Sequence, residues 1–162
     1  MFELHDTSTL SKPERYAALL SQAQGLFDGE RDAIANAANL SALIFHGLPG
    51  LNWAGFYLLK DGGLVLGPFQ GKPACIRIAL GRGVCGTAAA TRRTQVVEDV
   101  HAFPGHIACD SASNSEIVVP LLDGERLLGV LDLDSPEHAR FDDTDRAGLE
   151  ALAALWVSAS DH

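Results

Sequence analysis

The chain has 162 residues, of which 47% are hydrophobic and 20% charged, so disordered and fibrous structures are poor interpretations. With 12 basic against 21 acidic residues, its formal net charge of −9 disfavours nucleic acid or an anionic membrane as partner. No stretch reaches the roughly 18 to 20 apolar residues of a membrane-spanning helix, and residues 1–10 lack the basic start of a signal peptide. We therefore expect one cytoplasmic domain over residues 1–162.

Two helices are predicted in the first third of the chain. Ser11 and Glu14 form a capping-box pattern with Pro13 in the first turn, so a helix should cover residues 12–24. Apolar side chains then recur near a 3.6-residue period over residues 31–46, and a Gly-Leu-Pro-Gly stretch ends this second helix.

Short apolar runs separated by turn residues follow from residue 52 onward, which is typical of strands. In chain order we predict strands at 53–59, 64–66 and 76–80, a short helix at 84–90, a strand at 95–98, an irregular segment at 99–114, hairpin strands at 117–122 and 126–134, and a helix at 142–158. This order favours an α+β domain whose terminal helices cover one face of a sheet.

The hairpin carries a group of acids. Asp132 and Asp134 are two residues apart in a strand, so both side chains point to one face. A three-residue loop over 123–125 would place Glu116 directly opposite Asp132, whereas a two-residue loop would turn Glu116 to the other face. Three clustered carboxylates would attract an ammonium ion and raise the pKa of at least one carboxyl; solvated strand ends are the alternative.

An aromatic pair lies on the first strand. Trp53, Gly55 and Tyr57 share one face, and the residues between them take the core face. The missing side chain at Gly55 leaves a gap between two rings that could hold a small apolar group or a cation, although ordinary packing is the commoner role.

The three cysteines differ in setting. Cys109 lies in a polar irregular segment and is the best candidate for a nucleophile. Cys75 begins a strand, and Cys85 lies among glycines and alanines, where a small buried side chain fits. An odd number of cysteines argues against a disulfide framework, and the spacing leaves all three pairings open.

Two other patterns are weaker. His101, His106 and Cys109 lack a familiar zinc spacing, so we expect no metal site there. The glycines at 81, 83 and 86 match a dinucleotide-binding fingerprint in form, but too few residues follow for a βαβ unit of about 30 residues. Tight turns and helix packing explain these glycines better.

Five segments form a more specific combination: Asn52-Trp-Ala-Gly-Phe-Tyr57, Gly71-Lys-Pro-Ala-Cys75, Gly81-Arg-Gly-Val-Cys85-Gly, Cys109-Asp-Ser-Ala-Ser-Asn-Ser-Glu116-Ile-Val-Val-Pro120 and Gly129-Val-Leu-Asp132-Leu-Asp134-Ser. Together they resemble a single GAF domain of the free methionine-(R)-sulfoxide reductase family, over nearly the whole chain. The resemblance implies a mostly antiparallel central sheet, with N- and C-terminal helices on one face and a ligand pocket on the other.

The resemblance also implies roles for single residues. Cys109 would be the attacking thiol, Cys75 the resolving partner and Cys85 an auxiliary or structural thiol. The substrate pocket would be formed by residues that strand alternation already groups on pocket faces: Trp53, Tyr57, Glu116, Asp132 and Asp134.

The implied substrate is free L-methionine (R)-S-oxide, with its ammonium at the acids, its methyl group at Trp53 and its carboxylate at backbone N–H groups of residues 113–115. Cys109 would attack the sulfoxide sulfur while Glu116 or an aspartate such as Asp134 supplies a proton. The resulting sulfenic acid would condense with Cys75 to a disulfide that thioredoxin reduces. No metal or organic cofactor is expected, and a homodimer is expected from the resemblance alone.

Two other classes of function stay open. GAF domains generally sense cyclic nucleotides, amino acids or chromophores, although three acids would repel a phosphate and we expect no output domain here. The chain could also be an amino-acid-binding protein with idle cysteines. Replacing Cys109 by serine separates both from the enzyme, because a binding module keeps its ligand response.

Overall fold

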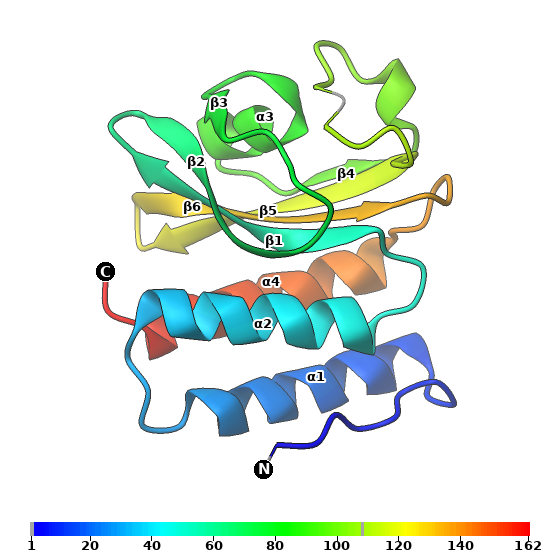
Figure 1. Cartoon of the computed structure of the whole chain (residues 1–162), viewed down its shortest axis with the longest axis vertical. Helices are drawn as coiled ribbons and strands as arrows, with labels where there is room; N and C mark the ends of the chain where they lie inside the picture. Colours follow the sequence, from blue (N-terminus) through cyan, green and yellow to red (C-terminus); the bar gives the residue numbers. More distant parts are fainter. Residues whose placement is uncertain (1, 108) are drawn as a thin grey trace.

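One six-stranded antiparallel sheet, in the order β3-β2-β1-β6-β5-β4, organises the chain (Figure 1). The structure is a computed structural model and describes residues 2–107 and 109–162. Its elements are α1 (Lys12–Phe27), α2 (Ala33–Gly47), β1 (Trp53–Lys60), β2 (Gly63–Gly71), β3 (Arg77–Ala79), α3 (Gly83–Thr91), β4 (Gln95–Val97), the 3-10 helix η1 (Val100–Ala102), β5 (Ser115–Asp123), β6 (Arg126–Ser135) and α4 (Asp143–Ala159). The α+β fold class predicted from the sequence is confirmed.

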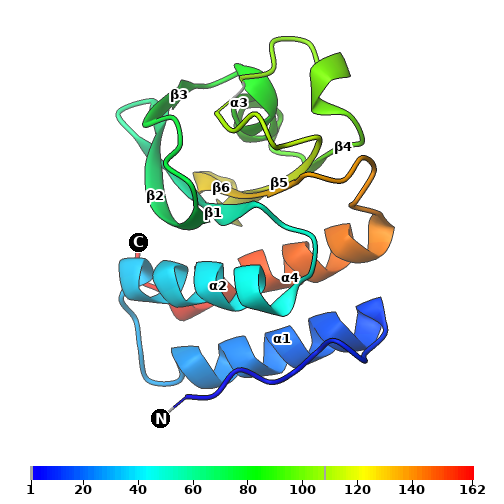
Figure 2. The same cartoon turned by 45° about the vertical axis from the view of Figure 1, so that its right-hand side comes forward.

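Three helices lie on one side of this sheet. α2 and α4 pack against the sheet, and α1 covers both of them from outside (Figures 1 and 2). The main apolar core fills this side, with Phe56 of β1 and Trp156 of α4 in contact at its centre. None of the helices in residues 2–107 and 109–162 has the length and apolarity to cross a membrane.

Helix starts follow the sequence signals closely. Ser11 and Glu14 form the predicted capping box, and Asp142 forms a second one with Asp145 at the start of α4. α1 continues past the predicted end at residue 24 to Phe27, because Phe27 is buried in the core and this packing outweighs the weak helix propensity of Gly25.

The opposite side of the sheet carries α3 and the irregular segment that follows β4 (Figure 2). Gly81 and Gly83 have positive φ values of 83° and 61°, and a side chain at Gly86 would collide with the backbone of Ala79. These glycines form a tight turn and a close helix contact, as predicted, rather than a dinucleotide-binding loop.

The β5–β6 hairpin differs from its predicted register. Its loop is the two residues Gly124 and Glu125, and a bulge follows, because Leu121 pairs with Gly129 while Leu122 pairs with Leu127. The prediction that Glu116 lies opposite Asp132 was therefore wrong; Glu116 pairs with Asp134. The extra bulged residue preserves the parity of the register, so Glu116 still shares a face with both aspartates.

Candidate active site

Three carboxylates from neighbouring strands lie on the sheet face opposite the helices. Glu116 pairs with Asp134, and Asp132 is two residues earlier on β6, so their side chains leave the sheet on the same side. Glu116 and Asp132 are only 6% and 5% exposed, and Asp134 is half-buried. The sheet therefore brings together the acids that the sequence grouped on one face.

These acids hold their protons more tightly than exposed carboxyls do. Burial, followed by the charges of Asp132 and Asp134, raises the pKa of Glu116 well above its usual range. Burial, followed by the charges of Asp132 and Asp110, likewise raises the pKa of Asp134. Burial raises the pKa of Asp132 only to about 6, because hydrogen bonds with Glu116 and Cys85 counteract it. These shifts favour a cluster that keeps at least one proton near neutral pH.

The aromatic pair of β1 is present on the same face, but the gap between its rings is filled. Trp53 stacks on Tyr57 with ring centroids 5.9 Å apart, and on Phe69 of β2 at 5.1 Å. Gly55 pairs with Phe69, whose side chain occupies the space that a side chain at Gly55 would need. Phe69 therefore leaves no room for a small ligand between the two rings, and Gly55 serves the ordinary strand packing that the sequence favoured.

Both aromatic side chains hold the segment that carries Cys75. The indole N–H of Trp53 donates to the carbonyl oxygen of Lys72 at 3.1 Å, and the hydroxyl of Tyr57 donates to that of Cys75 at 2.8 Å. The sequence assigned these two residues to the pocket wall, and the structure adds this anchoring contact, which only tertiary structure can show.

Cys75 and Cys109 form a disulfide, with Cα atoms 5.8 Å apart and 34 residues of sequence separation. This bond links the segment after β2 to the irregular segment after η1. A cavity of about 40 Å³ is lined by Cys109 and by all three acids, together with Trp53, Tyr57 and Cys85. Thiol chemistry at Cys109 would therefore take place beside groups that carry transferable protons.

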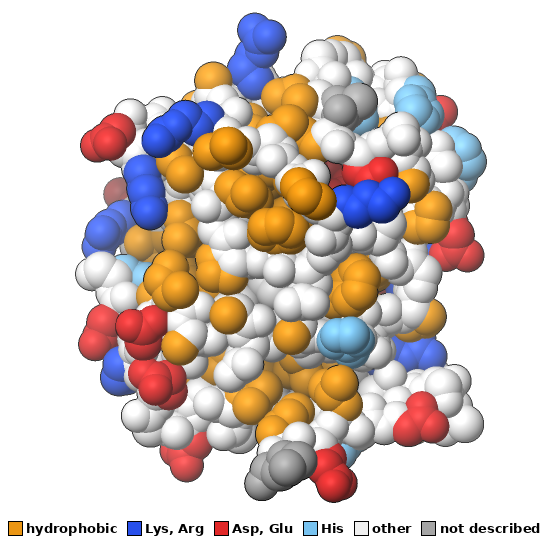
Figure 3. All heavy atoms as spheres, in the orientation of Figure 1, with side chains coloured by type: hydrophobic (Ala, Val, Ile, Leu, Met, Phe, Trp, Pro, Cys, Tyr) orange, Lys and Arg blue, Asp and Glu red, His pale blue; other side chains and the backbone are white. Residues whose placement is uncertain are grey.

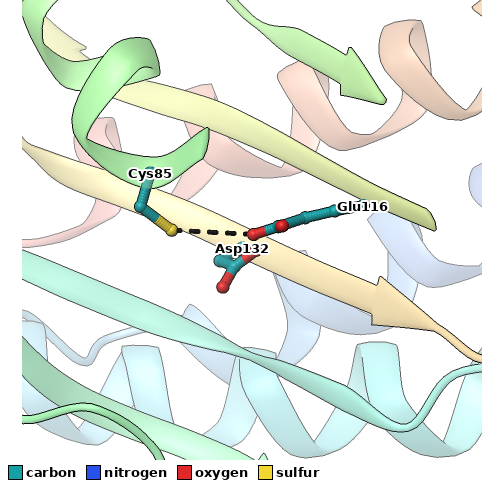
Figure 4. A group of neighbouring side chains, drawn as sticks. All are labelled: Cys85, Glu116 and Asp132. Atoms are coloured by element: carbon teal, nitrogen blue, oxygen red, sulfur yellow. Dashed lines mark hydrogen bonds between the residues drawn. The ribbon is translucent and has the colours of Figure 1, made fainter. Parts of the chain in front are cut away.

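Cys85 of α3 is buried and is the free cysteine of the described residues. Its Sγ lies 3.9 Å from Oε1 of Glu116, and the carboxylate of Asp132 completes a close group with them (Figure 4). Burial, followed by the charges of Asp132, Glu116 and Asp134, raises the pKa of the Cys85 thiol well above its usual value. The thiol is therefore protonated and unreactive near neutral pH, in line with a structural or auxiliary role.

The histidines of the irregular segment make no metal group with Cys109 within the part of the chain that the structure describes. Nε2 of His106 lies 4.0 Å from Oε2 of Glu116. Burial, followed by the charge of His101, lowers the pKa of His106, so its ring is neutral near pH 7 and this contact carries little ion-pair energy.

Asn52 has a contact that the sequence analysis missed. Its Nδ2 donates to Oδ2 of Asp110 and to Oγ of Ser113, both at 3.0 Å, which ties the end of the irregular segment to the start of β1. Asn52 belonged to a recognised motif, but neither partner is near it in sequence.

Two of the backbone N–H groups that the sequence assigned to the substrate carboxylate have hydrogen-bond partners within the chain. The N–H of Ser113 donates to the carbonyl of Asp110, and that of Asn114 donates to the carbonyl of Ser135. Both N–H groups are therefore engaged in this structure.

Comparison with known proteins adds to this geometry. A GAF domain family model matches residues 38–159. The chain is 56% identical to the free methionine-R-sulfoxide reductase of Escherichia coli over 145 residues, covering 90% of this chain and 88% of that protein. The crystal structure of the Neisseria meningitidis free methionine-R-sulfoxide reductase, solved with its substrate, superposes with a TM-score of 0.93 at 46% identity and covers 98% of this chain and 95% of that one. The reduced Staphylococcus aureus enzyme has a TM-score of 0.87 at 52% identity, covering 89% of this chain and 94% of its own.

The fold, with its antiparallel sheet, helices on one face and a cavity on the other, is that of a GAF domain. Among GAF domains, a cavity lined by three acids, an aromatic pair and a disulfide-forming cysteine is typical of a thiol-dependent reductase. The chain belongs to the free methionine-R-sulfoxide reductase family of oxidoreductases.

Proposed function

We propose that this chain reduces free L-methionine (R)-S-oxide to L-methionine through a cysteine sulfenic acid and an intramolecular disulfide. The observation that carries this proposal is the position of the Cys75–Cys109 disulfide beside a cavity lined by Glu116, Asp132 and Asp134. The names of the Escherichia coli and Neisseria meningitidis relatives support it.

The acidic cluster supplies the selectivity. The ammonium group of a free amino acid would pair with Asp132, whose pKa is raised only to about 6, with Glu116 and Asp134 as further hydrogen-bond partners. An amide nitrogen inside a polypeptide carries no such charge and would leave the buried carboxylate unpaired, which is costly. The indole of Trp53 lines the same cavity and provides an apolar wall for the methyl group.

The chemistry follows from the remaining protons. In the reduced enzyme the Cys109 sulfur attacks the sulfoxide sulfur while Glu116 or Asp134, which keep their protons near neutral pH, protonates the sulfoxide oxygen. The hydroxyl group then moves to the Cys109 sulfur as the substrate S–O bond and the new S–S bond break, which gives a cysteine sulfenic acid and methionine, and the thiol proton of Cys109 returns to the carboxylate that acted as the acid. Cys75 then attacks this sulfenic acid, which forms the disulfide and releases water. An external dithiol supplies the two electrons, so the cycle requires no metal or organic cofactor.

A thioredoxin-type dithiol protein is the reductant that the surface favours. Three large apolar side chains that lie within five residues of Cys75 or Cys109 in the sequence are exposed: Ile76 at 67%, Leu80 at 40% and Ile107 at 37%. In the orientation of Figure 1, Figure 3 shows hydrophobic side chains gathered on the upper half of the molecule, where β2, β3 and α3 lie. Lys and Arg side chains surround them. An apolar surface beside an accessible disulfide allows a protein thiol to approach and form the mixed disulfide.

Single-turnover assays test the chemistry. Pre-reduced wild-type enzyme and Cys75→Ser should each release about one methionine per chain from the free R epimer and none from the S epimer, because Cys75 acts only after oxygen transfer. Cys109→Ser should release none. Methionine release by Cys109→Ser would show that Cys109 is not the attacking nucleophile. A wild-type chain that binds the sulfoxide without reducing it would favour a sensor.

A second assay tests the reductant surface. Ile76→Ser should raise the KM for thioredoxin while leaving turnover with dithiothreitol unchanged, because the small reductant needs no docking surface. Ile34→Ser is the matched control, since Ile34 is also exposed, at 53%, but lies on α2 beyond the other face of the sheet. Equal effects of both substitutions would contradict docking at the disulfide.

A further inference from the structure

We infer that Cys85, Glu116 and Asp132 form a binding site for a soft divalent cation of the Zn²⁺ type. The proposed catalytic cycle uses Cys75 and Cys109 and assigns no role to the buried thiol of Cys85. Figure 4 shows that Cys85 of α3 points down onto the sheet, where its sulfur meets the carboxylates of Glu116 and Asp132.

The spacing of the three side chains fits a metal ion. One donor atom of each residue, a sulfur and two oxygens, lies within 4.8 Å of the others, and the Cys85 sulfur is 3.9 Å from the Glu116 oxygen. In a tetrahedral zinc site, bonds of about 2.3 Å to sulfur and 2.0 to 2.2 Å to oxygen separate the donor atoms by roughly 3.4 to 3.6 Å. Rotamer adjustments of about 1 Å would therefore bring all three atoms onto one ion.

An unpartnered atom indicates that the group lacks a ligand. Oδ1 of Asp132 is buried and has no hydrogen-bond partner among the described residues. Among the described residues, no lysine or arginine forms an ion pair with Asp132 or Glu116. A buried carboxylate is stable when a cation or hydrogen-bond donor compensates it, and a metal ion supplies this compensation.

The donor set selects the type of cation. A thiolate with two carboxylates favours Zn²⁺ and similar ions, whereas Mg²⁺ and Ca²⁺ prefer oxygen ligands alone. All three residues line the cavity of about 40 Å³, which has room for a water molecule as the fourth ligand. The Cys85 thiol and the Glu116 carboxyl, whose pKa values are both raised, release their protons to solvent when the metal binds.

If the proposed function holds, this ion would exclude the substrate, because its ligands include the carboxylates that the ammonium group requires. Zinc-type ions would then act as inhibitors that compete with free methionine sulfoxide. Binding of the metal can be tested without turnover, so failure of the metal site and failure of the proposed function are distinguishable.

The test uses oxidised, metal-free protein, in which the Cys75–Cys109 disulfide leaves Cys85 as the free thiol. Titration with Co²⁺ should produce a thiolate-to-cobalt charge-transfer band together with the visible bands of a tetrahedral site. Stoichiometric Zn²⁺ should remove these bands, and excess Mg²⁺ should not.

Variants make the assignment specific. Cys85→Ser should lose the charge-transfer band, and Asp132→Asn should keep it with affinity weakened about 10- to 100-fold. Glu125→Gln, which removes an exposed carboxylate at the hairpin turn, should bind like the wild type. Absence of the band in the wild type, its survival in Cys85→Ser, or equal weakening by Asp132→Asn and Glu125→Gln would each overturn the site. Circular dichroism checks folding, and Asp132→Asn decides the question if Cys85→Ser does not fold.

Discussion

Buried carboxylates occur on both sides of the sheet, and their surroundings differ. On the helix side, Asp145 has no exposed surface, and its oxygens accept from Nζ of Lys12 at 2.8 Å and from the hydroxyl of Tyr16 at 2.7 Å, with Nη1 of Arg140 at 3.4 Å. On the pocket side, Glu116 and Asp132 are almost as deeply buried, yet in the described chain neither forms an ion pair with a lysine or arginine.

The presence or absence of basic partners distinguishes a structural acid, Asp145, from acids that can bind a cationic ligand. Asp145 links α1, α4 and the segment before α4 because its charge is compensated within the fold. In the described residues no lysine or arginine compensates Glu116 or Asp132, and burial raises the pKa values of the pocket acids. The missing cation is the feature that an ammonium group can supply.

The largest effect should come from removing a pocket acid. Glu116→Gln should lower kcat about 10²- to 10⁴-fold, because a general acid is lost, while the free energy of unfolding changes by less than about 1 kcal/mol. The reason for this small change is that a protonated carboxyl and an amide are nearly isosteric. Steady-state kinetics and urea denaturation measure the two quantities. A large loss of stability with unchanged kcat would assign Glu116 to the structural class.

The converse substitution should act on stability. Asp145→Ala should lower the free energy of unfolding by roughly 3 to 5 kcal/mol, because Lys12 and Arg140 lose their buried partner. The folded fraction should keep the wild-type kcat, since Asp145 lies on the other side of the sheet from the cavity. Urea denaturation, with kcat measured at low temperature, would show whether the two effects separate as expected.

A smaller effect should appear in the pH dependence of stability. The pKa of Asp132 is about 6 in the folded protein, above its value of 3.8 in the unfolded chain, so the folded state binds this proton more tightly. This contribution is complete below about pH 4 and is lost as the pH rises through 6, by up to about 3 kcal/mol. The difference in unfolding free energy between wild type and Asp132→Asn should follow this curve, and a flat difference would contradict it.

The smallest effect concerns the contact between Asn52 and the irregular segment. Asn52→Ala removes two hydrogen bonds, to Asp110 and Ser113, worth about 1 kcal/mol each. We expect about a tenfold lower kcat/KM with little change in global stability, because the segment next to Cys109 is held less firmly. Amide hydrogen exchange in residues 109–114 should increase, and unchanged exchange would assign no positioning role to Asn52.

Local patterns predicted much of the fold and the shared face of the acids. Asp132 and Asp134 alternate with buried leucines, and Ser11 and Asp142 are strong N-caps, so these features depend on neighbours in sequence. The implied pairing of Cys75 with Cys109 came from family resemblance, since spacing alone left three pairings open.

The features that the sequence analysis missed depend on contacts between distant residues. The bulge at Leu121 and Leu122 changes the hairpin register, and the residues of the loop do not predict this bulge. Phe69 fills the space at Gly55 because β2 extends beyond its predicted end at residue 66. Both differences come from strand pairing, which short-range patterns do not encode.

Under the proposed function, the pocket acids recognise the ammonium group of a free amino acid. The most direct test compares kcat/KM for free L-methionine (R)-S-oxide and for its N-acetylated form, in wild type and in Asp132→Asn. We expect the wild type to prefer the free substrate by about 10⁴-fold and the variant to lose most of that preference, because the unpaired carboxylate is gone. Equal kcat/KM values for the two substrates in the wild type would contradict the account.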